Sequence, residues 1–162
     1  MSPHAVYTAG DADELAAALA AALAAVAEIL PPGPASPEAL ASVQQLRAEA
    51  DLRGLLRPDL AVEAGTVVVD PDTTLRPSPG VRTIRVHSIP EPEATLLALE
   101  PWRGRLQGAA LAGEAWRLAD PLRELGITRC AAPGSLQAPD ASWHNGGAHP
   151  IELLTAPDTH SS

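Results

Sequence analysis

The spacing of apolar residues predicts two helices in the first third of the chain. Apolar side chains recur every three or four positions over residues 15–30 and 40–50, which is the spacing of one helix face. Asp11 and Glu14 form a capping box before the first helix, and Pro31 ends it. Ser36 and Pro37 mark the start of the second. The positions expected to face the core are Leu15, Leu19, Leu23, Val26 and Leu30, then Leu40, Val43, Leu46 and Ala50.

Short apolar runs predict strands, with turn-rich sequence between them, over residues 5–8, 60–70 and 81–89. In the last run, Thr83, Arg85 and His87 alternate with apolar residues, which indicates one solvated face. Arg82 and Arg85 could clamp a carboxylate or a phosphate there. A strand face with arginines is more often simply solvated, and that interpretation is favoured. A short helix is expected to follow, ending at Leu99.

The pattern over residues 106–131 predicts strand, helix and strand. Apolar runs over residues 106–111 and 127–131 flank a helical pattern over residues 114–125, and Gly126 stands where a helix C-cap is expected. Two strands joined through a helix lie parallel, and a parallel sheet needs cover on both faces. We therefore predict an α/β fold with a mostly parallel sheet flanked by helices. Its length predicts one domain over residues 1–156, with a disordered tail over residues 157–162.

Composition and charge exclude several partners. The chain has 162 residues, a formal net charge of −9 and no lysine among its basic residues. Phosphate backbones and anionic membranes repel such a chain, and no Schiff-base or Walker-type lysine exists in it. Phe is absent, so the core must consist of Leu, Val and Ala, and we expect a marginally stable domain or one that needs a partner surface. The apolar run over residues 15–30 contains Glu28 and is short for a membrane span, so we expect a soluble, cytoplasmic protein.

Cys130 is the only cysteine, so an internal disulfide is excluded and a reducing compartment is indicated. A catalytic thiolate needs a lowered pKa and partial exposure. Cys130 lies in a predicted buried strand, where a free cysteine usually behaves as a small core residue. The core interpretation is favoured, and a redox or acyl-carrying role stays open as the alternative.

A Gly- and Pro-rich loop over residues 133–150 follows the last strand, at the sheet edge where α/β proteins bind ligands. Within it, His144 could act as a general acid or base, or hydrogen-bond an acyl carbonyl or a cofactor. The alternative is that Trp143 fills an apolar gap and His144 caps a turn. Asn145 and the glycines after it favour a tight turn over a phosphate nest. His149 completes no metal site, because no carboxylate or cysteine cluster joins it, and we expect no metal.

The segment over residues 124–154 resembles the C-terminal segment of the acyl-CoA reductases related to the fatty-acid reductase of bacterial luminescence. The family pattern is a Gly-hydrophobic-x-Arg strand, then Pro-x-Gly-x-x-Gln-x-Pro, Trp-His, and a Gly before another Pro. Asn145 and Gly146 depart from it, where the family has a His-Asp pair. The matching residues are Gly126, Ile127, Arg129, Pro133, Gly134, Gln137, Pro139, Trp143, His144, Gly147 and Pro150.

This resemblance implies part of an aldehyde-dehydrogenase-like catalytic domain, in an enzyme that reduces a fatty acyl-CoA to an aldehyde with NADPH. In the family the nucleophilic cysteine is followed closely by Ser-Pro, and Ser2 and Pro3 match that pair. The resemblance thus implies that the nucleophile lies upstream of Met1 and that Ser2 and Pro3 line the site. From their place in the loop, Trp143 and Asn145 are also predicted to line the site, and His144 is the candidate catalytic residue.

No Gly-x-Gly-x-x-Gly turn between a strand and a helix is found in the sequence, so no cofactor-binding residues are assigned. We therefore expect a C-terminal fragment or a split subunit, inactive alone, that acts with an N-terminal half or as a homo-oligomer. The alternative is a non-catalytic binding or assembly module that packs on a partner chain.

Overall fold

The computed structural model describes residues 3–56 and 64–138. Ser2, the predicted strand residues 60–63 and the predicted tail lie outside the described residues. The chain divides into two compact units, residues 1–98 and 99–162, and each is described here by itself. The prediction of one domain over residues 1–156 stays a prediction.

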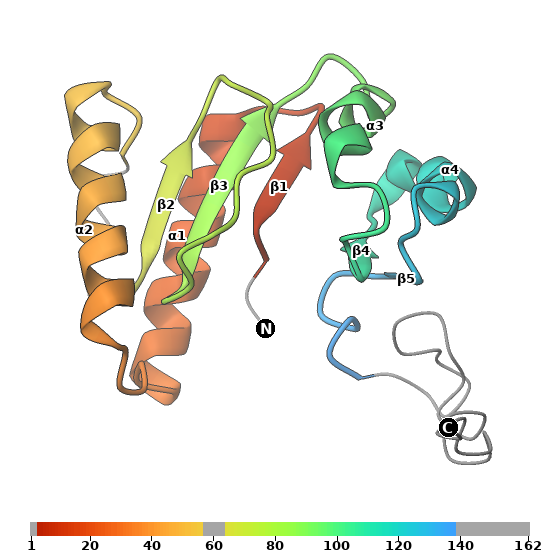
Figure 1. Ribbon diagram of the computed structural model, residues 1–162. Helices are drawn as coiled ribbons and strands as arrows, with labels where there is room; N and C mark the ends of the chain where they lie inside the picture. Colours follow the sequence, from red (N-terminus) through yellow and green to blue (C-terminus); the bar gives the residue numbers. More distant parts are fainter. Residues whose placement is uncertain (1–2, 57–63, 139–162) are drawn as a thin grey trace, which may run out of the picture. The chain divides into compact units, whose positions relative to one another are not determined.

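The first unit contains a three-stranded parallel sheet with a helix after its first strand (Figure 1). The strand order is β1-β3-β2, and β3 pairs with both neighbours in parallel, so that Tyr7 lies beside His87 and Val68 beside Arg85. The predicted α/β class with a mostly parallel sheet is confirmed. The elements in chain order are β1 (Ala5–Thr8), α1 (Ala12–Ile29), α2 (Pro37–Leu52), β2 (Thr66–Val69), β3 (Thr83–Ser88) and α3 (Ala94–Leu99).

Both predicted helix starts are confirmed. The Asp11 carboxylate accepts hydrogen bonds from the backbone N–H groups of Asp13 and Glu14, at 2.8 and 3.0 Å. The Ser36 hydroxyl accepts one from the N–H of Ala39 at 3.2 Å. These bonds satisfy N–H groups that have no partner inside the helix, which fixes where each helix begins.

The apolar face of the sheet packs against α1 and forms the core of this unit. Val67 and Val86 of the sheet and Ala16 of the helix have no exposed surface. Small residues let helix and strands approach closely, which suits a chain without Phe.

Three of the residues predicted to face the core are instead exposed: Val26, Leu30 and Leu40. Leu40 lies near the start of α2, whereas for Val26 and Leu30 the reason is the length of α1. An 18-residue helix extends about 27 Å, whereas a four-residue strand extends about 13 Å, so the last turns of α1 run past the strand it covers.

The second unit also pairs its strands in parallel, with Gly108 beside Arg129 and Ala110 beside Ala131, as predicted. The predicted helix over residues 114–125 differs, because its first half is a 3₁₀ helix and only residues 119–124 are α-helical. Pro121 has no N–H to donate and is tolerated only in the first turn, so the α-helix cannot begin much earlier. The elements are η1 (Glu100–Trp102), β4 (Gly108–Ala110), η2 (Gly113–Leu118), α4 (Ala119–Glu124) and β5 (Arg129–Ala131).

Among the described helices, none combines the length and the apolar character that a membrane span requires.

Candidate functional site

One of the residues predicted to line the site, Pro3, lies within the described residues. It is exposed and lies two residues before β1, at the amino-terminal edge of the parallel sheet. Ser2, Trp143, His144 and Asn145 lie outside the described residues, and so does His149. Of the residues predicted to form the site, the structure therefore describes Pro3, and the roles assigned to the other residues stay predictions.

A turn in a left-handed backbone conformation lies at this same edge. Gly80, Val81 and Arg82 have φ angles of 80°, 48° and 53°, and β3 begins at the next residue. A left-handed conformation costs a residue with a side chain about 1–2 kcal/mol, and it is rarest for β-branched residues such as Val. Backbone strain of this kind persists where the surrounding structure enforces it, and it gathers at functional sites. The sequence Ser-Pro-Gly indicated a turn here but not two strained residues after the glycine.

Hydrogen bonds hold the turn to the sheet and to the segment after Pro3. The N–H of Ser78 donates to Nδ1 of His4 at 3.0 Å, although the two residues are 74 positions apart. The Ser78 hydroxyl donates to the carbonyl of Thr83 at 2.9 Å and accepts from the N–H of Gly80 at 3.1 Å. The carbonyl of Arg82 accepts from the N–H of Thr66 at 3.1 Å. The strained turn thus joins the entry to β1 with the entries to β2 and β3.

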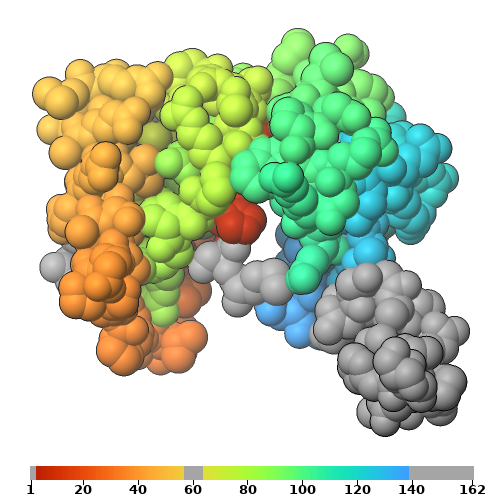
Figure 2. Space-filling model, in the orientation of Figure 1, coloured from red at the N-terminus to blue at the C-terminus, as the bar shows by residue number. Residues whose placement is uncertain are grey.

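The polar face of β3 is buried, so the prediction of a solvated face was wrong. Thr83 and His87 have no exposed surface and Arg85 is 8% exposed. The loop over residues 70–82 crosses this face and forms the surface above it (Figures 1 and 2). It provides polar partners, because the carbonyl of Pro77 accepts a hydrogen bond from Arg85 Nη1 at 3.2 Å.

Arg82 also differs from the prediction of a solvated side chain. It is partly buried, and its Nη2 donates to the carbonyl of Leu30, just after the end of α1.

Each of the three polar residues of β3 has a buried polar atom without a partner among the described residues. These atoms are the Thr83 hydroxyl, Arg85 Nε and His87 Nε2. A buried polar group without a hydrogen bond costs about 1–3 kcal/mol, so native proteins usually satisfy such groups with water or a ligand. The polar face of β3 is therefore a place where a small polar group is expected to bind.

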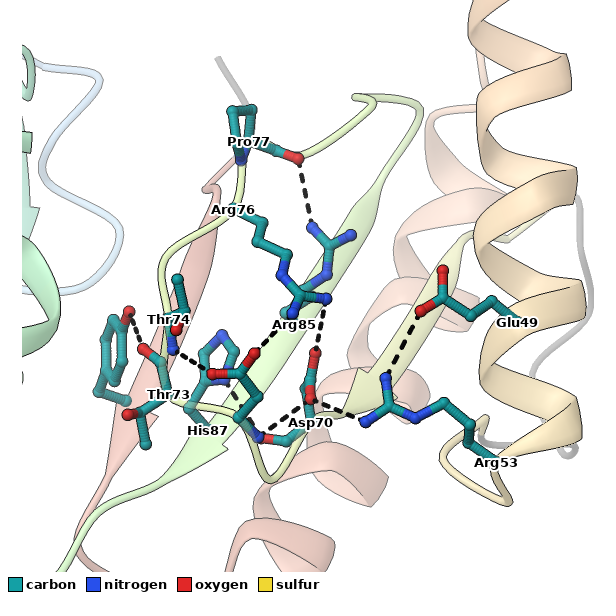
Figure 3. Close-up of polar contacts among 11 residues, drawn as sticks. Glu49, Arg53, Asp70, Thr73, Thr74, Arg76, Pro77, Arg85 and His87 are labelled. Carbon is teal, nitrogen blue, oxygen red and sulfur yellow. Dashed lines mark hydrogen bonds and ion pairs between the residues drawn. The ribbon is translucent and has the colours of Figure 1, made fainter. Parts of the chain in front are cut away.

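A charged cluster surrounds Asp70, the residue that directly follows β2 (Figure 3). Asp70 is 4% exposed. Its two carboxylate oxygens lie 3.9 Å from Arg53 Nη2 and 3.9 Å from Arg76 Nη1, and one of them accepts the N–H of Asp72 at 3.1 Å. This cluster could not be predicted from local sequence, because Arg53 precedes Asp70 by 17 positions and only the fold brings it close to Asp70 and Arg76.

The pKa of Arg85, which lies beside this cluster, is shifted by its surroundings. Burial lowers the pKa of Arg85, and the nearby charge of Arg76 lowers it further, whereas Asp70 and Glu49 raise it. A guanidinium group keeps its charge even so, because its ordinary pKa is above 12. The cluster therefore contains a buried positive charge, Arg85, and a buried negative charge, Asp70.

Tyr7 and His87 lie on the same buried face, with ring centroids 5.0 Å apart in a stacked arrangement. The Tyr7 hydroxyl donates to the carbonyl of Thr73 at 3.0 Å, and burial, together with the charge of Asp72, raises the pKa of Tyr7 to about 12. Burial lowers the pKa of His87, although the carbonyl of Asp70, 3.2 Å from Nδ1, opposes this shift. Both rings are therefore uncharged at neutral pH.

Cys130 lies in β5 of the second unit and is partly buried. Its thiol is 3.9 Å from the carbonyl of Ala119, and burial raises the pKa of Cys130, with a smaller opposing effect from Arg123. A raised pKa keeps the thiol protonated, whereas a catalytic cysteine needs a lowered one. These properties favour the interpretation of Cys130 as a core residue.

Several residues of the family-like pattern have structural roles in the second unit. Arg129 Nη2 donates to the carbonyls of Ser135 and Ala138, both at 2.9 Å, and so holds the loop that begins at Pro133. Gly126 has a φ of 91° and its backbone approaches Gly104 so closely that a Cβ would lie 2.9 Å from the Gly104 Cα. In this part of the family-like pattern, Arg129 therefore anchors the loop, and Gly126 permits a close approach between two backbone segments.

Within residues 3–56 and 64–138, no group of three or more His, Cys, Asp or Glu side chains is arranged to hold a metal ion.

A parallel sheet flanked by helices, with a strained turn at its amino-terminal edge, defines an α/β protein of the kind that forms part of a dehydrogenase-like domain. The family described as Acyl-CoA reductase (LuxC) matches residues 1–156, nearly the whole chain. The chain belongs to this acyl-CoA reductase family, which confirms the resemblance seen in the sequence. Among curated proteins, none matches the chain.

Proposed function

We propose that the chain takes part in the NADPH-dependent reduction of a fatty acyl-CoA to the aldehyde, together with a polypeptide segment that supplies the nucleophilic cysteine. The observation that carries this proposal is the family match over residues 1–156. The state of Cys130 supports the second part, because the one thiol among these 162 residues is partly buried with a raised pKa. These properties of Cys130 support the proposal that another polypeptide segment supplies the nucleophile.

The reaction needs a thiolate and a hydride donor. The thiolate attacks the acyl carbonyl and forms an enzyme thioester, and the bond to the CoA sulfur breaks, so that CoA leaves as a thiol after taking up a proton. A bound NADPH would supply a hydride to the carbonyl carbon of the thioester, and the bond to the enzyme sulfur would then break to give the aldehyde and restore the thiolate. Overall, acyl-CoA, NADPH and a proton give aldehyde, CoA and NADP⁺.

The amino terminus of α1 does not fit the pyrophosphate of a dinucleotide. Such a group usually binds at the amino terminus of the helix that follows a parallel strand. In the first unit one such helix is α1, which follows β1, and the N–H groups of its first turn already bond to the carboxylate of Asp11. Asp13 and Glu14 add negative charge to the same turn. We therefore assign no role in binding the cofactor to the amino terminus of α1.

The proposed contribution of this chain is to position the segment that enters β1. If Ser2 and Pro3 follow the nucleophile as the resemblance implies, the hydrogen bond between His4 and Ser78 ties that segment to the strained turn at residues 80–82. A rigid support of this kind orients a nucleophile relative to its substrate.

The test is reconstitution of turnover. The chain is mixed with the polypeptide that carries the upstream cysteine, and NADPH oxidation is followed by absorbance with a long-chain acyl-CoA. We expect turnover in the mixture and not in either component alone, and Cys130→Ala should retain it within about two-fold, since surface and inert positions change little. Loss of turnover in the folded Cys130→Ala protein would refute the assignment of the nucleophile.

The exposed apolar residues at the end of α1 favour the alternative of a binding or assembly module. Ile29 is 85% exposed and Leu30 64% exposed, beside Val26 at 44%. A contiguous apolar surface of this kind is typical of a protein contact. Tight binding to the same polypeptide without NADPH oxidation would support the module instead of the reductase.

A further inference from the structure

A loop of two consecutive turns, over residues 132–138, follows β5 in the second unit (Figure 1). In the first turn the N–H of Ser135 donates to the carbonyl of Ala132 at 3.0 Å, and Gly134 has a φ of 85°. A proline followed by a glycine with a positive φ is the arrangement of a type II turn. In the second turn the N–H of Ala138 donates to the carbonyl of Ser135 at 3.2 Å. The turns therefore determine the internal shape of this loop, but not its place on the strand pair.

Arg129 of β5 determines that place. Its Nη2 donates to the carbonyls of Ser135 and Ala138, both at 2.9 Å, so one nitrogen holds the second turn at its first and last residues. Hydrogen bonds from a charged donor are stronger than those between neutral groups. The carbonyl of Ser135 also accepts the N–H of Ala138, and a carbonyl oxygen has two lone pairs for two such bonds. The turn and its anchor therefore share one carbonyl and support each other.

A glycine in the neighbouring strand makes room for the same loop. Gly108 of β4 is the register partner of Arg129, so the two residues face the same side of the strand pair. A Cβ at Gly108 would lie 3.2 Å from Cδ2 of Leu136, which is partly buried. The φ of Gly108 is not positive, so its backbone conformation does not require glycine. Space for Leu136 is therefore the physical reason for a glycine at this position, and one pair of facing residues both admits the loop and anchors it.

The anchor limits where the candidate catalytic residue can lie. His144 follows Ala138 by six positions and Ala131, the last residue of β5, by 13 positions. At about 3.5 Å per extended residue, six residues reach about 20 Å and 13 residues reach about 45 Å. An anchored Ala138 therefore confines His144 to less than half of the distance that β5 alone would allow.

We propose that Arg129 is a positioning residue for the reductase reaction, and that it places His144 by anchoring the loop over residues 132–138 to β5. The role in the reaction rests on the proposed function, whereas the anchor does not. Small displacements of a reacting group lower the rate of the chemical step strongly, so an anchor of this kind should affect kcat more than KM.

The first measurement tests the anchor on the 162-residue chain by amide hydrogen exchange followed by NMR. Arg129→Met removes both donated hydrogen bonds and keeps an unbranched side chain, and the N–H of Ala138 should then exchange about ten-fold faster. Arg123→Met is the matched control, because Arg123 is an exposed arginine of the same unit whose salt bridge, to Asp120, lies within α4. It should leave the exchange of the Ala138 amide unchanged to within about two-fold.

The second measurement tests the positioning role by NADPH oxidation in the mixture with the polypeptide that carries the upstream cysteine. Arg129→Met, folded by circular dichroism, should lower kcat at least about ten-fold with KM unchanged to within about three-fold. Arg129→Lys keeps a charged donor and should recover part of this loss. In a His144→Ala background, Arg129→Met should lower kcat by less than about two-fold further, because residues that act through one another are not additive. Gly108→Ala keeps both hydrogen bonds of Arg129 but displaces Leu136, and should lower kcat in the same direction.

Unchanged exchange of the Ala138 amide in Arg129→Met would overturn the anchor. An unchanged kcat in the folded Arg129→Met protein would overturn the positioning role, and so would a loss of kcat that is equally large in the His144→Ala background. If His144→Ala alone leaves kcat unchanged, Arg129 does not act through His144 and the proposal is wrong. Absence of turnover with the native chain would refute the proposed function, and with it the role of Arg129 in the reaction, while the exchange measurement would still decide the anchor.

Discussion

Gly65, which precedes β2, is the position where the fold is most sensitive to a single methyl group. Its φ is 145°, a conformation that residues with a side chain rarely adopt. A Cβ there would lie 2.7 Å from the carbonyl oxygen of Arg82 and 3.2 Å from a methyl group of Leu23. That carbonyl accepts the N–H of Thr66, the first hydrogen bond between β2 and β3, so the clash cannot be relieved without loosening the sheet.

The expected cost of Gly65→Ala follows from two separate effects. The backbone conformation alone costs about 1–3 kcal/mol. Forcing a methyl group into close contact costs roughly another 1–3 kcal/mol. We therefore expect a loss of about 4 kcal/mol in the free energy of unfolding, a large share of the roughly 5–15 kcal/mol that domains have.

Two other glycines separate these effects. Gly80 has a φ of 80° but no atom within 4 Å of its would-be Cβ, so Gly80→Ala has the backbone cost alone, about 1 kcal/mol. Gly33 has neither feature, and Gly33→Ala should be neutral to within about 0.5 kcal/mol. Urea unfolding followed by circular dichroism measures all three. If Gly65→Ala and Gly80→Ala lose the same stability, the close contact at Gly65 does not exist as described.

Three further predictions concern the buried polar face. Asp70→Asn keeps an acceptor for the N–H of Asp72 but removes the negative charge opposite the arginines. It should lower the free energy of unfolding in urea by about 2 kcal/mol, less than for a fully buried ion pair, because two of the arginines are partly exposed. A loss under about 0.5 kcal/mol would contradict a stabilising role for this charge. Burial lowers the pKa of His87, so the unfolded chain binds a proton at His87 more tightly than the folded chain does. The free energy of unfolding should therefore fall as the pH drops below about 6.5, by at most about 1.4 kcal/mol per pH unit. His87→Gln should remove this pH dependence. Tyr7 is the only tyrosine, and its ultraviolet titration should have a midpoint at about pH 12 in the folded chain, against about 10 in urea. The free energy of unfolding should fall as the pH rises above the pKa of the unfolded chain. A midpoint near pH 10 in a chain that circular dichroism shows to be folded would refute the burial of Tyr7.

Much of the fold could be predicted from local sequence. The caps at Asp11 and Ser36 are local features, and they placed both long helices correctly. The strand-helix-strand pattern of the second unit predicted parallel pairing, which the structure confirms. Pro121 was the local signal for the 3₁₀ segment before it, and the helical periodicity around it obscured that signal.

The candidate site was harder to predict, because its residues come from distant parts of the chain. Alternation along β3 correctly separated a polar face from an apolar one, but alternation says nothing about what covers the polar face. Asp70 and Arg85 are brought together by strand pairing, and His4 and Ser78 by the return of the loop along the sheet. Of the residues predicted to line the site or to act in it, the structure describes Pro3, so the roles of the others stay predictions.

The loop over residues 70–82 has a consequence for how this protein can vary. Connecting loops ordinarily tolerate insertions and deletions, because they lie outside the packed interior. This one provides the carbonyls of Asp70, Thr73 and Pro77 to buried side chains of the sheet, and its Leu75 is itself buried. Adding or removing one residue would move each of these carbonyls away from its partner. The loop is therefore expected to be constrained in length as strictly as a strand, and loop grafting or tag insertion should avoid it.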